Sequence, residues 1–134
     1  VNSYIKKRTV LPGAVSFLKS LKGNSISSAL ISNDSKKGIE NFIEHNGLFH
    51  LFCNFWSADH QPAKPSPEAV KRLCKLLKLE PSECALIGDA DSDLQMANQS
   101  GIDLVIGYTG GWTQKPDLHH HQYLIHNWDE VTIQ

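Results

Sequence analysis

Short apolar segments alternate with segments of helical periodicity along this chain, and this alternation restricts the possible folds most. Apolar runs bounded by polar residues predict buried strands. They are residues 26–32, 51–57, 84–88, 103–108 and 122–126. Strands that alternate with helices predict a parallel sheet with helices on both faces. The expected fold class is therefore α/β and Rossmann-like.

The intervening segments carry apolar residues at helical spacing and recognisable ends. Predicted helices are residues 12–22, 36–47 and 67–79, and a fourth from about residue 92 to residue 101. Pro12 and Pro67 suit first helical turns, and Ser66 suits the N-cap of the third helix. Gly47 and Gly101 suit helix ends. With 134 residues, one domain is expected.

Composition excludes several classes of partner. The formal net charge of −1 gives no electrostatic reason to expect nucleic acid. No apolar run approaches the roughly 20 residues that a membrane span needs.

Cys53, Cys74 and Cys84 form no CxxC pair, which suits core packing in a reducing cytoplasm. Adjacent histidines seldom share one metal ion, so the role of residues 119–121 stays open.

Polar side chains follow three of the predicted strands. They are Ser32, Asn33 and Asp34 after the first, Lys64 after the second, and Asp89, Asp91 and Asp93 after the third. The carboxyl ends of parallel strands meet at one edge of a sheet, where ligands bind. A hydroxyl, an ammonium group and clustered carboxylates suit a phosphate group and Mg²⁺. The sequence therefore predicts one phosphate and metal site at this edge.

Each of these residues also has a purely structural interpretation. Ser32 could cap a helix, Lys64 could be a solvated surface lysine, and Asp91 or Ser92 could cap the following helix. Asp89 is harder to explain in this way, because a carboxylate directly after a buried strand is costly without a partner. Either a cation or several N–H donors must compensate it.

Three segments resemble motifs of the haloacid dehalogenase-like (HAD) hydrolase superfamily. "ALISND" resembles the second motif, "AKPSPEAV" the third, and "ALIGDADSDLQMANQSGI" the fourth. "LPGAVSFLKSLK" resembles the helix that such enzymes place after their cap domain. The resemblance spans residues 11 to about 112, and the nearest group is the phosphoglycolate phosphatases and related small-molecule phosphatases.

This resemblance implies a Mg²⁺-dependent phosphatase that acts on a small phosphorylated metabolite in the cytoplasm through an aspartyl-phosphate. Ser32 would hold the transferring phosphoryl group with help from Asn33, and Lys64 would neutralise it. Asp89 would bind Mg²⁺, and Asp93 would bind it directly or through water. The substrate and the oligomeric state are not implied.

One departure from the family pattern is important. The superfamily attacks phosphorus with an aspartate in a DxDxT-like first motif, and no aspartate of this sequence has that context. We expect the chain to begin after this strand and after the cap, with residues 1–10 as the cap's tail and residues 11–134 as a partial core. Alone it should be inactive. Strands 26–32 and 84–88 should then stand roughly 9–10 Å apart, about two strand spacings.

Three other functions remain to be weighed. A non-catalytic HAD-like module that binds phosphate or a partner would also lack the nucleophile. A haloalkanoate dehalogenase needs no metal, which the pair Asp89 and Asp93 argues against. A response-regulator receiver combines similar groups, but its acidic residues come first in the chain and here they come last.

Overall fold

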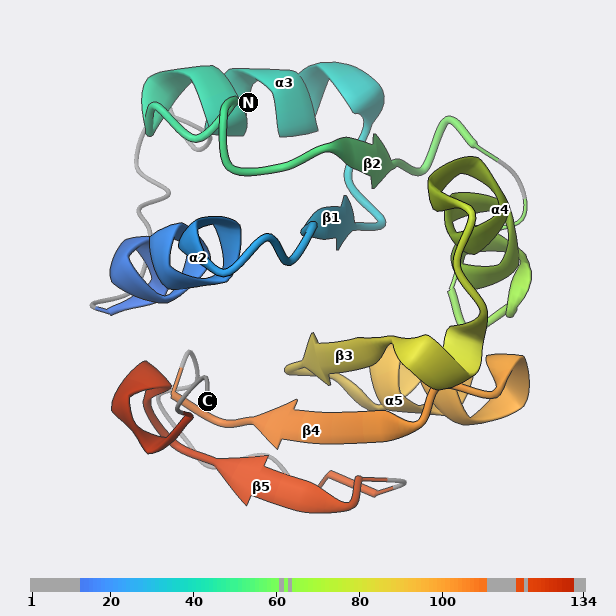
Figure 1. Ribbon diagram of the computed structural model, residues 1–134. Coiled ribbons are helices and arrows are strands. Elements are labelled where there is room, and N and C mark those ends of the chain that lie inside the picture. Colours follow the sequence, from blue (N-terminus) through green and yellow to red (C-terminus); the bar gives the residue numbers. More distant parts are fainter. Residues whose placement is uncertain (1–12, 61, 63, 111–117, 120, 132–134) are drawn as a thin grey trace. The chain divides into compact units, whose positions relative to one another are not determined.

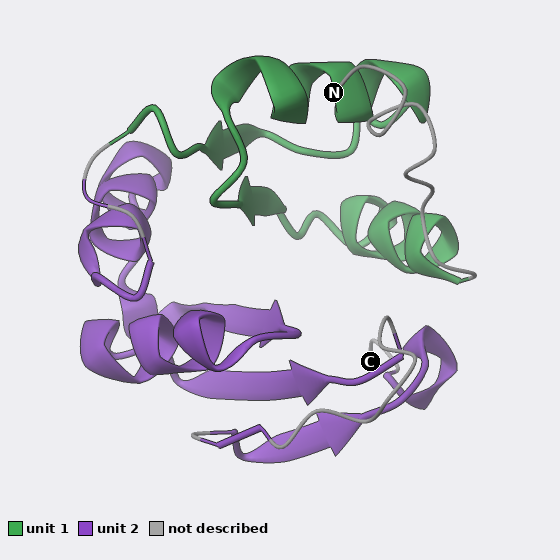
Figure 2. Cartoon of the chain, turned by 180° about the vertical axis from the view of Figure 1, so that it is seen from behind, with its two compact units in different colours: residues 1–61, 132–134 green, residues 62–131 purple. Residues whose placement is uncertain are grey.

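The polypeptide divides into two units, one formed by residues 1–61 with 132–134 and the other by residues 62–131 (Figure 2). The predicted cap tail, residues 1–10, lies outside the described residues, and the proposed domain boundary stays a prediction. A computed structural model describes residues 13–60, 62, 64–110, 118–119 and 121–131.

The described residues of the first unit form a two-stranded parallel sheet and two helices (Figure 1). Along the chain these are α2 (Ala14–Gly23), β1 (Ala29–Ile31), α3 (Lys36–His45) and β2 (Asn54–Trp56). In register, Ala29 lies opposite Asn54 and Ile31 opposite Trp56. The core consists of buried residues of α3 and the segment after it, namely Ile39, Ile43, Leu48 and Leu51.

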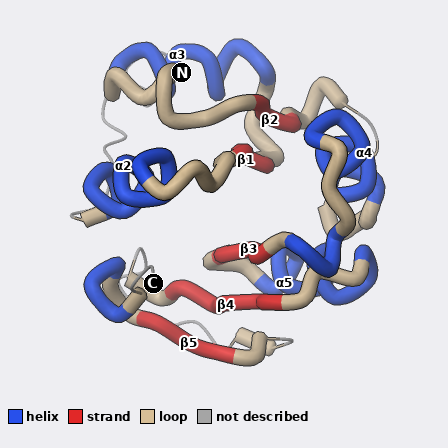
Figure 3. Tube along the Cα trace, in the orientation of Figure 1, coloured by secondary structure: helices blue, strands red, loops and turns tan. Residues whose placement is uncertain are grey.

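The second unit contains a three-stranded parallel sheet with the order β3-β4-β5 (Figure 3). Its elements are α4 (Glu68–Leu77), η1 (Pro81–Glu83), β3 (Ala85–Gly88), α5 (Asp91–Ser100), β4 (Leu104–Tyr108), β5 (Tyr123–Ile125) and η2 (Trp128–Glu130). Leu94 and Ala97 of α5 pack with Val105 of β4 in one buried cluster. This packing fixes the start of α5 beside the end of β3.

The predicted strands and helices are all present, and every strand pair is parallel, so the α/β class is confirmed. The ends differ from the prediction. Ser66 does not occupy the N-cap of α4; Pro67 does, and the Ser66 hydroxyl accepts a hydrogen bond from the Glu68 N–H at 3.3 Å. Strand β1 covers only three of its seven predicted residues, because its ladder with β2 begins at Ala29, opposite Asn54, and ends at Ile31, opposite Trp56.

Strands β1 and β3 belong to different sheets, and each lies at the edge of its own sheet among the described strands. β1 pairs with β2 and β3 pairs with β4, and the described residues contain no ladder between β1 and β3. The separation of roughly 9–10 Å between them stays a prediction.

The three cysteines have different surroundings. Cys74 is buried, and its Sγ lies 3.8 Å from that of Cys84. Burial, followed by the hydrogen bond and charge of Cys84, raises the pKa of the Cys74 thiol to about 11. Cys53 is exposed, so the prediction of core packing was wrong for that residue.

Among the described helices, none has the length and apolar character needed to cross a membrane.

Leu94 provides a test of the packing that places α5. Its side chain has 0% exposure, so Leu94→Ala should lower the free energy of unfolding by about 3–5 kcal/mol. Leu76→Ala on α4 is the control, because Leu76 is 66% exposed and its loss should change stability by about 0.5 kcal/mol or less. Urea unfolding followed by circular dichroism measures both. Equal stability of the two variants would contradict the described core.

Candidate active site

The turn from β3 into α5 is built around the carboxylate of Asp93. Strand β3 ends at Gly88, and α5 begins at Asp91, two residues before Asp93. Asp93 is only 7% exposed. Its Oδ2 accepts a hydrogen bond from the Ala90 N–H at 3.2 Å, and its own N–H donates to the Ala90 carbonyl at 3.0 Å. The carboxylate thus satisfies a free N–H at the helix start, where negative charge is also favoured.

Gly88 is required by the close approach of Asp93. A Cβ atom added at Gly88 would lie 2.4 Å from the Asp93 Cβ and 3.0 Å from its Cγ. No larger residue fits there unless Asp93 moves. The glycine of the "IGD" segment therefore permits the carboxylate to sit against the end of the strand.

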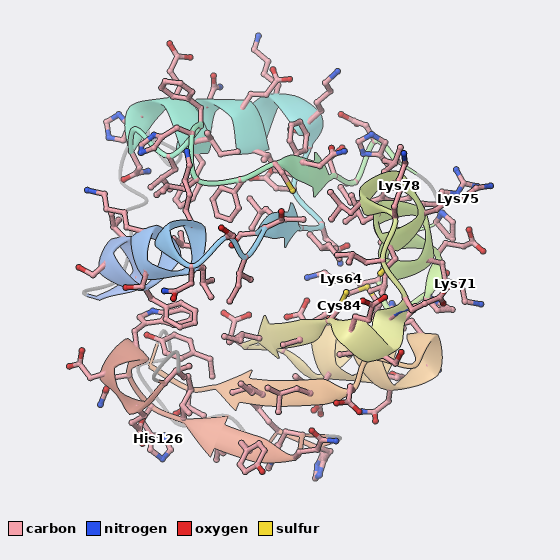
Figure 4. The ribbon with its side chains drawn as sticks, in the orientation of Figure 1. Lys64, Lys71, Lys75, Lys78, Cys84 and His126 are labelled. Carbon is pink, nitrogen blue, oxygen red and sulfur yellow. The ribbon has the colours of Figure 1, made fainter. Side chains whose placement is uncertain are left out.

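Lys64 forms an ion pair with the other oxygen of Asp93. Lys64 Nζ donates to Asp93 Oδ1, and the two side chains are 11% and 10% exposed. The Lys64 side chain is labelled in Figure 4. Lys64 lies in the segment before α4, 29 residues from Asp93. The interpretation of Lys64 as a solvated surface lysine was therefore wrong. Removing one member of a nearly buried ion pair leaves the other charge buried without its partner, which is costly. A substitution of Lys64 alone or of Asp93 alone should therefore destabilise the fold.

Asp89 lies beside this pair and is electrostatically disfavoured as an anion. Desolvation raises the pKa of its carboxyl, and the neighbouring Asp93 carboxylate raises it further. A backbone hydrogen bond and the Lys64 ammonium act in the opposite direction. Asp89 is exposed overall, so its desolvation is partial. A cation at this carboxylate would relieve both unfavourable contributions.

Two carboxylates are a small ligand set for a metal ion. Within the described residues, no group of three or more His, Cys, Asp or Glu is arranged to hold a metal. Mg²⁺ commonly uses one or two protein carboxylates and keeps several water ligands, so Asp89 and Asp93 fit this cation. They do not fit a metal that needs four protein ligands.

In the first unit, Ser32 follows β1 directly. Its N–H donates to the Trp56 carbonyl at 3.0 Å, and its hydroxyl accepts from the Asp34 N–H at 3.0 Å. The cap of α3 is Ser35, whose hydroxyl accepts from the Gly38 N–H at 3.0 Å. The interpretation of Ser32 as the helix cap was therefore wrong. Asn33, next in the chain, is exposed.

The structure thus brings together Lys64, Asp89 and Asp93 in the second unit, and Ser32 and Asn33 follow one strand end in the first. That all five face one cleft stays a prediction. The alternative that Asp91 caps α5 was wrong: it lies inside the helix, and its Oδ1 accepts from the His119 N–H at 2.7 Å.

Comparison with known proteins identifies the family. The family described as haloacid dehalogenase-like hydrolase matches residues 2–101. The chain belongs to this family. The match covers the segments around Ser32, Lys64 and Asp93 that resemble HAD motifs in the sequence.

Two curated relatives are named as phosphoglycolate phosphatases. The protein from Psychrobacter arcticus is 28% identical over 109 residues, which are 78% of this chain and 47% of the relative. Phosphoglycolate phosphatase 1 from Pseudomonas aeruginosa is 31% identical over 106 residues, 76% of this chain and 39% of the relative. This chain therefore spans less than half the length of either relative.

A solved structure supports the fold. The HAD-superfamily hydrolase from Ehrlichia chaffeensis superposes with a TM-score of 0.77 at 30% identity, covering 91% of this chain and 55% of that one. The predicted fold class, a HAD-like Rossmann core, is confirmed.

Proposed function

We propose that the native protein containing this sequence is a phosphatase that hydrolyses a small-molecule phosphomonoester. The observation that carries the proposal is the nearly buried Lys64–Asp93 ion pair beside the disfavoured Asp89 carboxylate, at the carboxyl end of β3. A lysine and two carboxylates at this position serve phosphate and cation binding together. A structural role for the ion pair alone would not require a second carboxylate next to it whose anionic form is disfavoured by desolvation and by Asp93.

Each residue has a role in this proposal. The Lys64 ammonium would neutralise phosphoryl oxygens, and the Ser32 hydroxyl would donate a hydrogen bond to the same group, assisted by Asn33. Phosphoryl transfer depends mainly on positioning and on compensating negative charge, which these groups supply. The attacking aspartate of an aspartyl-phosphate route would come from outside these 134 residues, because none of their aspartates lies in a DxDxT-like motif.

Mg²⁺ is the proposed cofactor, and it would neutralise charge on the phosphoryl group when bound. Asp89 would be its direct ligand. Both oxygens of Asp93 already accept hydrogen bonds, from Lys64 and from the Ala90 N–H. Asp93 would therefore act through a water molecule, and it would hold Lys64 in place.

Phosphoglycolate is the first substrate to test, because the two curated relatives carry that activity in their names. The cytoplasm is the proposed location, where the thiols of Cys53, Cys74 and Cys84 would stay in their free form.

Asp89→Asn should weaken Mg²⁺ binding by at least about tenfold, since it removes an anionic ligand without changing its shape. Because the folded state raises the pKa of Asp89, its ionised form costs stability at pH values above the usual range of a carboxyl. At neutral pH without metal, the variant should therefore melt at the same temperature as the parent or higher. Calorimetric Mg²⁺ titration and thermal melting of the native protein measure the two effects.

Asp91→Asn is the matched control, since an amide oxygen there can still accept from the His119 N–H. It should leave Mg²⁺ binding unchanged. The parent should also hydrolyse p-nitrophenyl phosphate and phosphoglycolate only when Mg²⁺ is present. A native protein without turnover of any phosphomonoester, or an Asp89→Asn variant that binds Mg²⁺ normally, would refute the proposed function.

A further inference from the structure

The loop after β2 is folded around the buried residue Ser57, which is 0% exposed. The Ser57 N–H donates to Nδ1 of His60 at 2.9 Å, and the Ser57 hydroxyl lies 3.0 Å from the same nitrogen. The His60 N–H donates to the Ser57 carbonyl at 3.0 Å, and the Asp59 N–H donates to the Ser57 hydroxyl at 3.2 Å. His60 thus closes the loop through both its backbone and its ring.

These contacts determine which nitrogen of His60 carries the proton. A backbone N–H can only donate, so Nδ1 must accept and carries no proton in this arrangement. The ring proton is therefore on Nε2. The ring also stacks on Trp56, with centroids 4.8 Å apart and an interplanar angle of 28°. Packing and hydrogen bonding together hold the imidazole in one orientation.

This loop and the last residue of β2 are attached to the segment from Ser32 to Lys36 at three points. The Ser32 N–H donates to the Trp56 carbonyl at 3.0 Å, and the Ala58 N–H donates to the Asp34 carbonyl at 2.7 Å. The third contact is at the start of α3, where Asp59 Oδ2 accepts from the Lys36 N–H at 2.8 Å. Any shift of the loop must therefore move the backbone on both sides of Ser32 and Asn33.

We propose that His60 is a positioning residue for phosphate binding, which acts by fixing this loop and through it the Ser32 hydroxyl. This inference rests on the proposed function, because it assigns Ser32 to the phosphate. His60 supplies the acceptor for a fully buried N–H, and burying that N–H without an acceptor is costly. Without the imidazole the loop must open to hydrate Ser57, and the three attachments to the Ser32 segment open with it.

Two substitutions in the native protein separate the acceptor from the aromatic ring. His60→Asn keeps an acceptor near the position of Nδ1 but loses the stacking on Trp56. His60→Phe keeps a ring against Trp56 but leaves the Ser57 N–H without a partner. Calorimetric titration with inorganic phosphate in excess Mg²⁺ compares the folded variants. His60→Phe should bind phosphate on the order of tenfold more weakly, the equivalent of one unsatisfied buried donor, and His60→Asn within about threefold of the parent.

A further variant and a further measurement keep the test decisive if His60→Phe does not fold. If His60→Phe does not fold, His60→Gln replaces it, because its amide corresponds to Nε2 and leaves Ser57 equally unpaired. In the parent, nitrogen chemical shifts of the His60 ring should show the proton on Nε2. Phosphate affinity of folded His60→Phe or His60→Gln equal to that of the parent would overturn the positioning role, and so would a proton on Nδ1.

If the proposed function is wrong, these experiments give a different result. The parent itself would then neither bind phosphate nor hydrolyse a phosphomonoester, and the inference would be overturned together with that function. If the parent hydrolyses phosphomonoesters and only the variant comparison fails, the function stands and the role of His60 does not.

Discussion

Replacing Gly88 by alanine is expected to lower the free energy of unfolding by about 3 kcal/mol and to displace the Asp93 carboxylate. The added methyl group would lie 2.4 Å from the Asp93 Cβ, a distance that forces one of the two groups to move. Asp93 cannot move without weakening its contacts to Lys64 and to the Ala90 N–H. The substitution should therefore destabilise the fold and the site together. Urea unfolding measures the first effect, and calorimetric Mg²⁺ titration of the native protein the second.

Gly23→Ala is the matched control for this prediction. Gly23 is the last residue of α2, and a Cβ atom added there would meet nothing within 4 Å. Alanine in a helix reduces the entropy of the unfolded chain relative to glycine, so this variant should be stabilised by up to about 1 kcal/mol. If Gly88→Ala were as stable as Gly23→Ala, the described packing of Asp93 against the end of β3 would be incorrect.

The sequence was sufficient to predict the strands, their parallel pairing and the order of strands and helices, because each strand is a short apolar run and each helix has a regular apolar face. It did not reveal which serine caps α3. Ser32 and Ser35 both precede the helix, and only the backbone geometry assigns the cap to Ser35. Strand ends were misplaced because residues 26–28 are compatible with a strand, but the ladder with β2 begins only at Ala29, opposite Asn54.

That Lys64, Asp89 and Asp93 lie close together was predictable from the sequence, but their contacts were not. Asp93 was assigned to a metal ion, and in the structure both its oxygens bind protein groups. Lys64 is 29 residues away, so no helical or strand spacing relates the two. The contribution of His60 was missed altogether, because a histidine two residues before a proline has no distinctive pattern in sequence. Only the burial of Ser57 shows that the ring nitrogen of His60 is needed, as the acceptor for the Ser57 N–H.

Breaking the Lys64–Asp93 pair from either side is expected to destabilise the native protein by about 3 kcal/mol. Lys64→Met leaves the Asp93 carboxylate without its cation, and Asp93→Asn leaves the ammonium without its anion, in side chains that are 10% and 11% exposed. The double variant leaves neither charge unpaired. It should therefore be more stable than the sum of the single effects predicts, by at least about 1.5 kcal/mol in a double-mutant cycle.

The exposed pair Arg72–Glu68 on α4 is the control for this cycle. Its side chains are 59% and 41% exposed, and its coupling in the variants Arg72→Met and Glu68→Gln should be about 0.5 kcal/mol or less. Equal coupling in the two cycles would contradict the burial of the Lys64–Asp93 pair.

Activity of the double variant then separates a structural role of this ion pair from a functional one. If the Lys64–Asp93 pair served only to stabilise the fold, a double variant with recovered stability would also recover phosphatase activity, because neither charge would remain uncompensated. If Lys64 also neutralises the phosphoryl group, stability should recover while kcat/KM for p-nitrophenyl phosphate stays at least about a hundredfold below the parent, since a charge-assisted contact to the transferring group is lost. Recovery of stability without recovery of activity is the result that we expect, because the proposed function assigns the Lys64 ammonium to the phosphoryl group and Asp93 to a water ligand of Mg²⁺.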